Sequence, residues 1–299
     1  MNSGLLLGQL LALLTSMFLA ENSIIFSFLG KNVGSDSVVH LRLWIATPVI
    51  VILAFIFEGN FLSLLSFSSL FSLLLSGIIG YFVCDSLLFW AFTNWGPRET
   101  MVVMTLNPVF TSIFSYIFFK EYLTILQIFA ICMTIMGIIL LIFGEKKTIK
   151  QTNDKNRVKG IFFAFLSSLL QAISLILAKS ALFEVGAMGS NSIRCVGGFV
   201  AVMVYSIFFR KQFSFDFHQF SNKKYLNLLI IASLTGPVLG MTMQMFAFDL
   251  APIGLVSAIV QINPLFILIF DWLYLKKSLS LWAILGTIVS VLGVALMFI

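Results

Sequence analysis

Runs of about 20 apolar residues, separated by short polar connections, make up most of the sequence. Such a run is long enough to cross the hydrocarbon core of a bilayer, where a continuous apolar segment satisfies its backbone polar groups by forming a helix. Only 10% of the residues are charged and 60% are hydrophobic, whereas soluble domains carry about 25% charged residues. The sequence therefore predicts an all-α membrane protein.

The polar connections divide the chain into ten expected transmembrane helices. They cover residues 4–28, 38–57, 69–93, 98–119, 123–143, 160–182, 190–209, 225–248, 253–275 and 280–299. The longest connection, "GEKKTIKQTNDKNRVKG", leaves five spans on each side. We therefore expect a first five-helix repeat at 1–143, a basic connecting loop at 144–159 and a second five-helix repeat at 160–299. Residues 4–20 follow no basic segment and precede no clear cleavage site, so we interpret them as part of a retained first span.

The two halves of the chain repeat one another. An offset of 152 residues aligns the start of the second span with the start of the seventh, and an offset of 156 aligns the third to fifth spans with the eighth to tenth. The matches that are hardest to obtain by chance are Gly34 with Gly186, Arg42 with Arg194, Gly80 with Gly236, Asn107-Pro108 with Asn263-Pro264 and Gly137 with Gly293. Because each half has an odd number of spans, the second enters the membrane from the opposite side, which is an inverted repeat typical of secondary transporters.

An asparagine–proline pair interrupts the fourth and ninth spans. The segments are "TLNPVF" (105–110) and "QINPLF" (261–266). Proline removes a backbone donor and disturbs the preceding turn, and interrupted helices at corresponding positions of two halves indicate a binding site near the membrane midplane. The alternative is that each proline only kinks its span and that neighbouring groups restore the lost hydrogen bond.

Three segments carry a family resemblance: "SGIIGYFVCDSLLFWAF", "GPRETMVVMTLNPVFTSIFSYIFFKEYLT" and "APIGLVSAIVQINPLFILIFDWLYLKKSLS". Together with the repeat, they resemble the EamA-type proteins of the drug/metabolite transporter superfamily over nearly the whole chain. The resemblance implies two EamA-type repeats, ten helices, a central cavity between the halves and alternating access, often in the export of metabolites or amino acids. One departure concerns the connection at 58–70, which carries no basic residue although this position is usually basic in the family.

Polar residues inside the spans are the candidate substrate-binding or coupling residues, because such residues are costly at membrane depth and functional by default. They are Glu21, Asp85, Asn107, Lys179, Gln244 and Asn263.

The carboxylates Glu21 and Asp85 could bind a substrate amine or carry a coupling proton. Glu21 lies late in the first span, so the alternative is contact with lipid headgroups. Asp85 shares a helix face with Leu88 and Phe89, and the repeat places Gln244 on the matching face of the eighth span. Such faces are more often plain packing surfaces, but the buried carboxylate favours a functional one.

The remaining candidates could contribute hydrogen bonds or positive charge. Asn107 and Asn263 could bind substrate or the carbonyl groups freed by the prolines. Lys179 could neutralise Glu21 or Asp85 or attract a substrate carboxylate, and the alternative is that its stem extends to the interface. The repetition of Arg42 and Arg194 favours a structural task for both over a substrate contact.

The function that fits this pattern is secondary transport of small metabolites, such as amino acids or related amines, with export favoured and proton coupling open. An intramembrane enzyme is the first alternative, but the sequence has no HExxH and no GxSxG motif. A non-transporting scaffold is the second. We expect no cofactor and no metal, and the three cysteines suggest no disulfide framework. The net charge of +6 lies in short loops and does not indicate a nucleic-acid partner.

Charge distribution gives the expected orientation. Lysine and arginine are concentrated in the first, third, fifth, seventh and ninth connections, and basic loops stay in the cytoplasm. This places both termini outside the cytoplasm, whereas the family resemblance implies both inside. We expect a multi-pass protein of the cytoplasmic membrane, with lipid and a small-molecule substrate as its partners and a homodimer left open.

Overall fold

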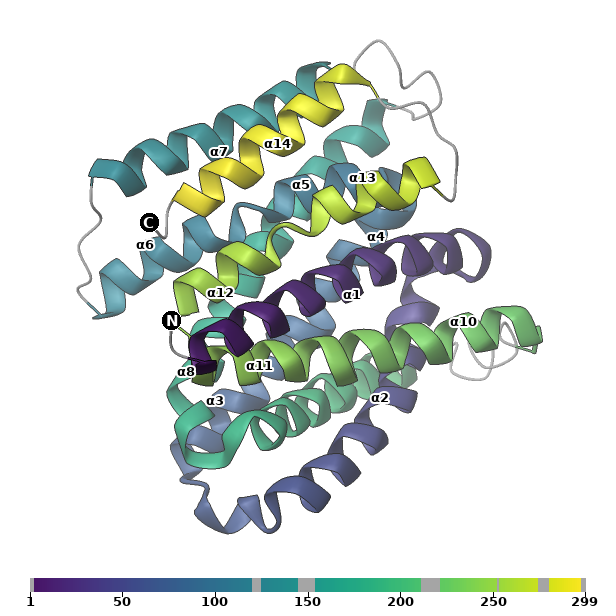
Figure 1. The fold of residues 1–299 in the computed structure, drawn as a ribbon. Helices are drawn as coiled ribbons and strands as arrows, with labels where there is room; N and C mark the ends of the chain where they lie inside the picture. Colours follow the sequence, from purple (N-terminus) through teal and green to yellow (C-terminus); the bar gives the residue numbers. More distant parts are fainter. Residues whose placement is uncertain are drawn as a thin grey trace.

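The computed structural model describes residues 3–119, 125–144, 154–210, 221–251, 253–273 and 280–296. Every regular element within these ranges is helical, which confirms the all-α prediction (Figure 1). The first half contains α1 (Ser3–Val33), α2 (Ser35–Glu58), η1 (Phe61–Leu64), α3 (Phe67–Gly77), η2 (Ile78–Cys84), α4 (Asp85–Asn94), α5 (Pro97–Met104), α6 (Asn107–Phe119) and α7 (Ile125–Gly144). The second half contains α8 (Asp154–Val204), η4 (Tyr205–Arg210), α10 (Lys223–Ser233), η5 (Leu234–Gly240), α11 (Met241–Leu250), α12 (Ile253–Val260), α13 (Asn263–Leu273) and α14 (Leu281–Leu296).

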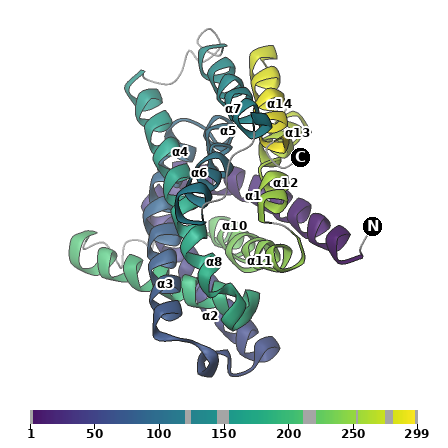
Figure 2. The same ribbon diagram turned by 90° about the vertical axis from the view of Figure 1, so that its left-hand side faces the viewer.

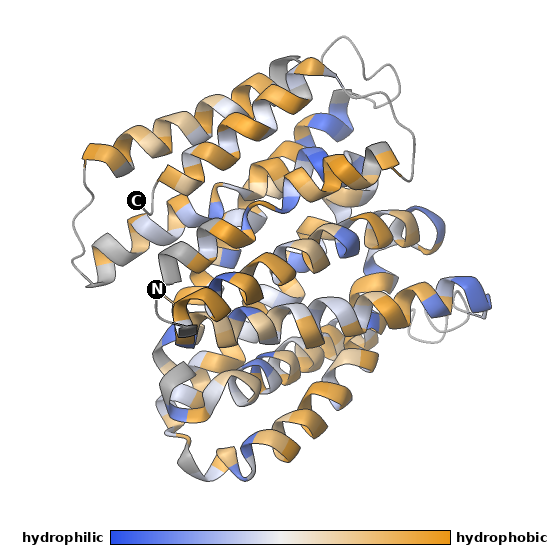
Figure 3. Ribbon diagram, viewed as in Figure 1, coloured by the Kyte–Doolittle hydropathy of each residue, from blue (hydrophilic) through white to orange (hydrophobic). Residues whose placement is uncertain are grey.

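Six helical stretches within the described residues are long and apolar enough to cross a membrane. They are Gly4–Val33, Ser35–Glu58, Phe67–Asn94, Lys155–Lys179, Glu184–Phe209 and Lys223–Leu250. Large apolar side chains face outward on them, among them Ile56, which is 66% exposed, and hydrophobic residues colour most of the ribbon (Figure 3). Of the other four predicted spans, the fourth and the ninth are each divided into two helices, α5 and α6 and then α12 and α13. Shorter apolar helices, Ile128–Leu140 and Ile284–Leu296, lie within the fifth and the tenth.

The internal repeat is visible in the element boundaries. The starts of α3 and α10, of η2 and η5, of α4 and α11, of α5 and α12, and of α6 and α13 all differ by 156 residues. Both η2 and η5 are π-helical. The structure therefore confirms the repeat for the stretch from α3 to α6, which has the same succession of elements as the stretch from α10 to α13.

One predicted connection is absent as a loop. The sequence predicted a break between spans ending at 182 and beginning at 190, but α8 continues through it with one non-helical residue, Gly186, at φ 72°. Glycine adopts a positive φ without steric cost, so one residue redirects the chain. Glu58 accepts hydrogen bonds from the next helical segment, from Met188 N at 2.8 Å and Gly189 N at 2.6 Å. The matching residue Gly34, at φ 90°, separates α1 from α2.

Helices α7 and α14 lie side by side at one edge of the molecule (Figures 1 and 2). Their close approach requires glycine, because a Cβ atom on Gly137 would lie 2.7 Å from the backbone oxygen of Gly286, and one on Gly293 would lie 2.9 Å from that of Ala130. Small residues that let backbones approach are typical of helix pairs in membranes. Gly137 on α7 therefore faces α14, and its repeat counterpart Gly293 on α14 faces α7.

Candidate functional site

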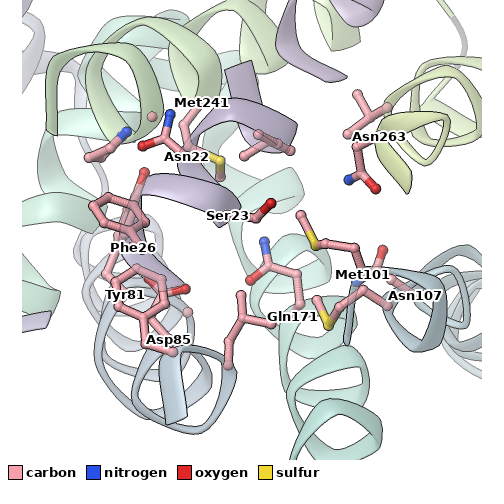
Figure 4. A pocket seen from close by; sticks show the side chains of 18 of the residues that line it. Asn22, Ser23, Phe26, Tyr81, Asp85, Met101, Asn107, Gln171, Met241 and Asn263 are labelled. Atoms are coloured by element: carbon pink, nitrogen blue, oxygen red, sulfur yellow. The ribbon is translucent and has the colours of Figure 1, made fainter. Parts of the chain in front are cut away.

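A cavity of about 110 Å³ lies where helices of the two halves meet. Its wall comes from α1, α2, η2, α4, α5 and α6 in the first half and from α8, η5, α11, α12 and α13 in the second. Figure 4 shows Tyr81 and Asp85 on one side of the cavity, Asn107 and Asn263 on the other, and Ser23 between them. Apolar side chains complete the wall, so the polar groups converge in an otherwise apolar enclosure.

The wall is built largely from matched positions of the repeat. At the offset of 152 residues, the cavity is lined by both members of the pairs Leu19 and Gln171, Ser23 and Leu175, and Arg42 and Arg194. At the offset of 156, it is lined by both members of the pairs Gly80 and Gly236, Tyr81 and Pro237, Asp85 and Met241, Leu88 and Gln244, Met104 and Val260, and Asn107 and Asn263. Corresponding faces of the two halves therefore enclose the cavity between them.

The asparagine–proline pairs break two of the lining helices. Helix α5 ends at Met104 in a tight turn, in which Leu106 N donates to Val103 O at 3.0 Å, and α6 begins at Asn107. The amide of Asn107 donates to Ser168 O at 3.3 Å, which fixes its side chain against α8. In the second half, α12 ends at Val260 and α13 begins at Asn263. The predicted interruptions are thus confirmed, and residues at both breaks line the cavity.

The π-helical segments η2 and η5 line the cavity through Gly80 and Gly236. A Cβ atom on Gly80 would lie 2.6 Å from Ser174 Oγ, and one on Gly236 would lie 2.8 Å from Asn22 Oδ1. Glycine at these positions therefore lets a polar side chain of a neighbouring helix approach the backbone. Single-turn π segments recur at functional sites of α-helices.

Three ionisable side chains, Arg42, Asp85 and Arg194, form what we call the charged corner of the cavity. Arg42 Nη2 pairs with Asp85 Oδ2 and also donates to Tyr81 O at 3.3 Å. Arg194 donates through Nε to Ser76 Oγ at 2.9 Å and through Nη2 to Ser174 Oγ at 3.3 Å. Both arginines are buried, so their charges act in a medium of low polarity.

Aromatic rings surround the charged corner. The guanidinium carbon of Arg42 lies 4.8 Å from the ring centre of Phe89, and that of Arg194 lies 5.4 Å from the ring centre of Tyr81. The Tyr81 hydroxyl donates to Asn191 Oδ1 at 2.5 Å. Ring faces attract cations, so these contacts stabilise both arginines without neutralising them.

A family model matches both halves of the chain. The model of the EamA-like transporter family matches residues 6–143 and again residues 158–299. The chain belongs to the EamA-like transporter family. Two EamA repeats therefore enclose the cavity, and membrane transport of small solutes is the activity that this family indicates.

Individual relatives agree with the EamA assignment. "Solute carrier family 35 member G1" of Mus musculus is 32% identical over 31% of this chain and 27% of its own length. An "Uncharacterized transporter" of Clostridium kluyveri is 23% identical over 66% of this chain and 64% of its own length. "Uncharacterized transporter YyaM" of Bacillus subtilis is 27% identical over 58% of this chain and 56% of its own length. The chain thus matches between 27% and 64% of the length of these relatives.

A solved crystal structure shares the fold. It superposes with a TM-score of 0.67 and covers 99% of this chain and 96% of the matched chain, at 15% sequence identity. At this identity the likeness concerns the fold alone.

The structure brings four of the six predicted site residues into the wall between the EamA repeats: Asp85, Asn107, Gln244 and Asn263. Glu21, on α1, and Lys179, on α8, are half-buried and lie outside the described lining. The neighbour of Glu21, Asn22, faces the cavity instead, because one position along a helix rotates a side chain by about 100°.

Arg42 and Arg194, for which the sequence favoured a structural task, also line the cavity between the EamA repeats, and Arg42 is the partner of Asp85. The signal was present, because repeated ionisable residues inside apolar spans are functional candidates. Tyr81 was missed altogether, since nothing in its local sequence separates it from the many aromatic residues of the chain.

Proposed function

We propose that this EamA-family chain is a secondary transporter that carries small metabolites across the cytoplasmic membrane by alternating access, with export as the favoured direction. The observation that supports this most is the cavity whose wall consists of matched positions from both repeats. When two similar halves enclose one site, an exchange of their conformations exposes that site first to one side of the membrane and then to the other.

The proposal includes ten spans arranged as two inverted five-helix repeats, in which the shorter and divided helices also cross the membrane. Divided helices at the midplane are common in secondary transporters, where they expose backbone groups to a substrate cavity. The breaks after Met104 and Val260 have this character, because both adjoin the cavity. The π-helical segments η2 and η5 add two further stretches of irregular backbone to the wall of the cavity.

Proton coupling through Asp85 is part of the proposal. Asp85 pairs with Arg42 in the wall of the cavity. A proton on Asp85 removes the negative charge of this pair and leaves Arg42 available to another anion. Binding of the proton and binding of the substrate would then depend on each other, which is what coupled transport requires.

The test is metabolite profiling of cells and medium with three forms of the full chain. Ser23→Phe fills the centre of the cavity, where Ser23 is 1% exposed, whereas Ile56→Phe alters an outward-facing side chain that is 66% exposed. We expect wild type and Ile56→Phe to change the distribution of at least one metabolite, and Ser23→Phe at equal expression to abolish that change. An equal change with Ser23→Phe, or no change with wild type, would contradict transport through this cavity.

A further inference from the structure

We infer that the cavity selects small organic anions, with Arg42 and Arg194 of the charged corner holding the anionic group. The inference rests on the proposed function and concerns the substrate class of that same site. The sequence alone leaves both amino acids and amines as candidate substrates. The inference favours carboxylate-bearing metabolites and disfavours simple amines.

The first argument is the charge of the wall. Among the described lining residues, the charged side chains are Arg42, Arg194 and Asp85, so the cavity carries one excess positive charge. Asp85 already forms an ion pair with Arg42. An uncompensated charge in a buried site is unfavourable, and an anion that enters the cavity relieves this cost. A cationic amine would increase this cost.

The second argument is the state of the guanidinium groups. Within the described structure, Arg194 Nη1 and Arg42 Nε are buried and have no hydrogen-bond partner. The other nitrogens of Arg194 are held by Ser76 and Ser174, so its plane is fixed beside the cavity. A guanidinium group with a preset orientation binds carboxylates more selectively than a flexible lysine does.

The third argument is the chemistry of the break between α12 and α13. In the described residues, Gln261 Oε1 and Asn263 Oδ1 are buried acceptors without a partner, and both residues line the cavity. A buried acceptor without a hydrogen-bond partner is stabilised by a donor such as a hydroxyl or an amide N–H. The complementary molecule therefore carries an anionic group for the charged corner and a hydrogen-bond donor for this break.

The size of the cavity limits the molecule. Its volume is about 110 Å³, and an apolar cavity of about 150 Å³ holds a molecule of the size of benzene. A small hydroxycarboxylate fits this volume, and bulky anions do not fit without expansion of the site.

Charge-selective thiol labelling tests the inference without knowledge of the substrate. All variants are made in the full chain with the substitution Cys132→Ser, which removes the exposed native cysteine. Cys84 and Cys195 remain, and both are buried. Met104→Cys then places a thiol on the cavity wall, and Asn32→Cys provides an exposed reference. The probes are 2-carboxyethyl, 2-aminoethyl and neutral methyl methanethiosulfonate, and the quantity measured is the ratio of the anionic to the cationic reaction rate.

We expect this ratio to be at least about tenfold higher at position 104 than at position 32, because opposite charges a few ångströms apart attract strongly in a site of low polarity. Gln244→Glu adds a negative charge to the wall and should lower the ratio, whereas Asp85→Asn removes one and should raise it. Asn60→Asp, in an exposed connection, is the matched control and should leave the ratio unchanged.

The outcomes separate the two proposals. If position 104 reacts with the neutral reagent but shows no preference for the anionic one, or if the ratio does not follow the charge of the wall, the anion inference is wrong and the transporter proposal stands. If position 104 does not react even with the neutral reagent, the cavity is closed to solutes, and both proposals are overturned.

Discussion

Replacement of Asp85 by asparagine should destabilise the protein by about 2–3 kcal/mol, somewhat less than the 3–5 kcal/mol typical of breaking a buried ion pair. The substitution keeps the shape of the side chain and one acceptor oxygen, but it leaves Arg42 buried without its counter-charge. Two unit charges about 4 Å apart attract by roughly 4 kcal/mol at an effective dielectric constant of 20. The asparagine oxygen retains part of this energy as a hydrogen bond, and the remaining contact of Asp85 with the cavity reduces it further.

The assay is reversible unfolding in mixed micelles, arranged as a double-mutant cycle with Arg42→Gln. Removing both charges should be less costly than the sum of the single variants by at least about 1 kcal/mol, because no unpaired buried charge remains. Glu184→Gln is the control, since this carboxylate is exposed, and it should change stability by less than about 1 kcal/mol. A cost below about 0.5 kcal/mol for Asp85→Asn, or an additive cycle, would refute the energetic role of the pair.

Two further substitutions test contacts outside the charged corner. Gly137→Ala should destabilise the protein by about 1–3 kcal/mol, because its new Cβ would collide with the backbone of α14 near Ser290, whereas Gly4→Ala has open space around it and should be neutral in a thermal unfolding assay. Glu58→Gln should cost about 1–2 kcal/mol in the same assay, since the carboxylate accepts two backbone hydrogen bonds after the Gly186 turn and the amide can accept only through its single oxygen. Equal melting temperatures for the two glycine variants, or for Glu58→Gln and wild type, would contradict these packing arguments.

The features that the sequence predicted well are those fixed by backbone chemistry. The Asn107-Pro108 and Asn263-Pro264 pairs stand where their helices break, and proline lacks the backbone donor that a helix interior uses. The repeat was also recognisable, because glycine and arginine recur rarely by chance in apolar runs. The Asn-Pro pairs led to Asn107 and Asn263, the ionisable group inside an apolar span led to Asp85, and the repeat led from there to Gln244. All four lie in the wall of the cavity.

The features that the sequence did not predict depend on how the helices are rotated against one another. Glu21 and Asn22 are neighbours in the sequence, yet only Asn22 lines the cavity. The pair of Arg42 and Asp85 joins α2 to α4. Close packing positions the surrounding helices, for example where Gly77 of α3 meets the backbone of Arg194 of α8. Such rotations are determined by contacts among many side chains, so hydropathy alone cannot supply them.

Accessibility of the cavity from each side of the membrane tests the central claim most directly. In a Cys132→Ser background, Asn263→Cys places a thiol on the wall of the cavity, and Ile56→Cys places one on an outward-facing apolar surface. Alternating access predicts that a membrane-impermeant thiol reagent labels position 263 in both right-side-out and inside-out vesicles, and that position 56 reacts in neither. Labelling of position 263 from one side only, or from neither, would contradict a site that the two EamA repeats expose in turn.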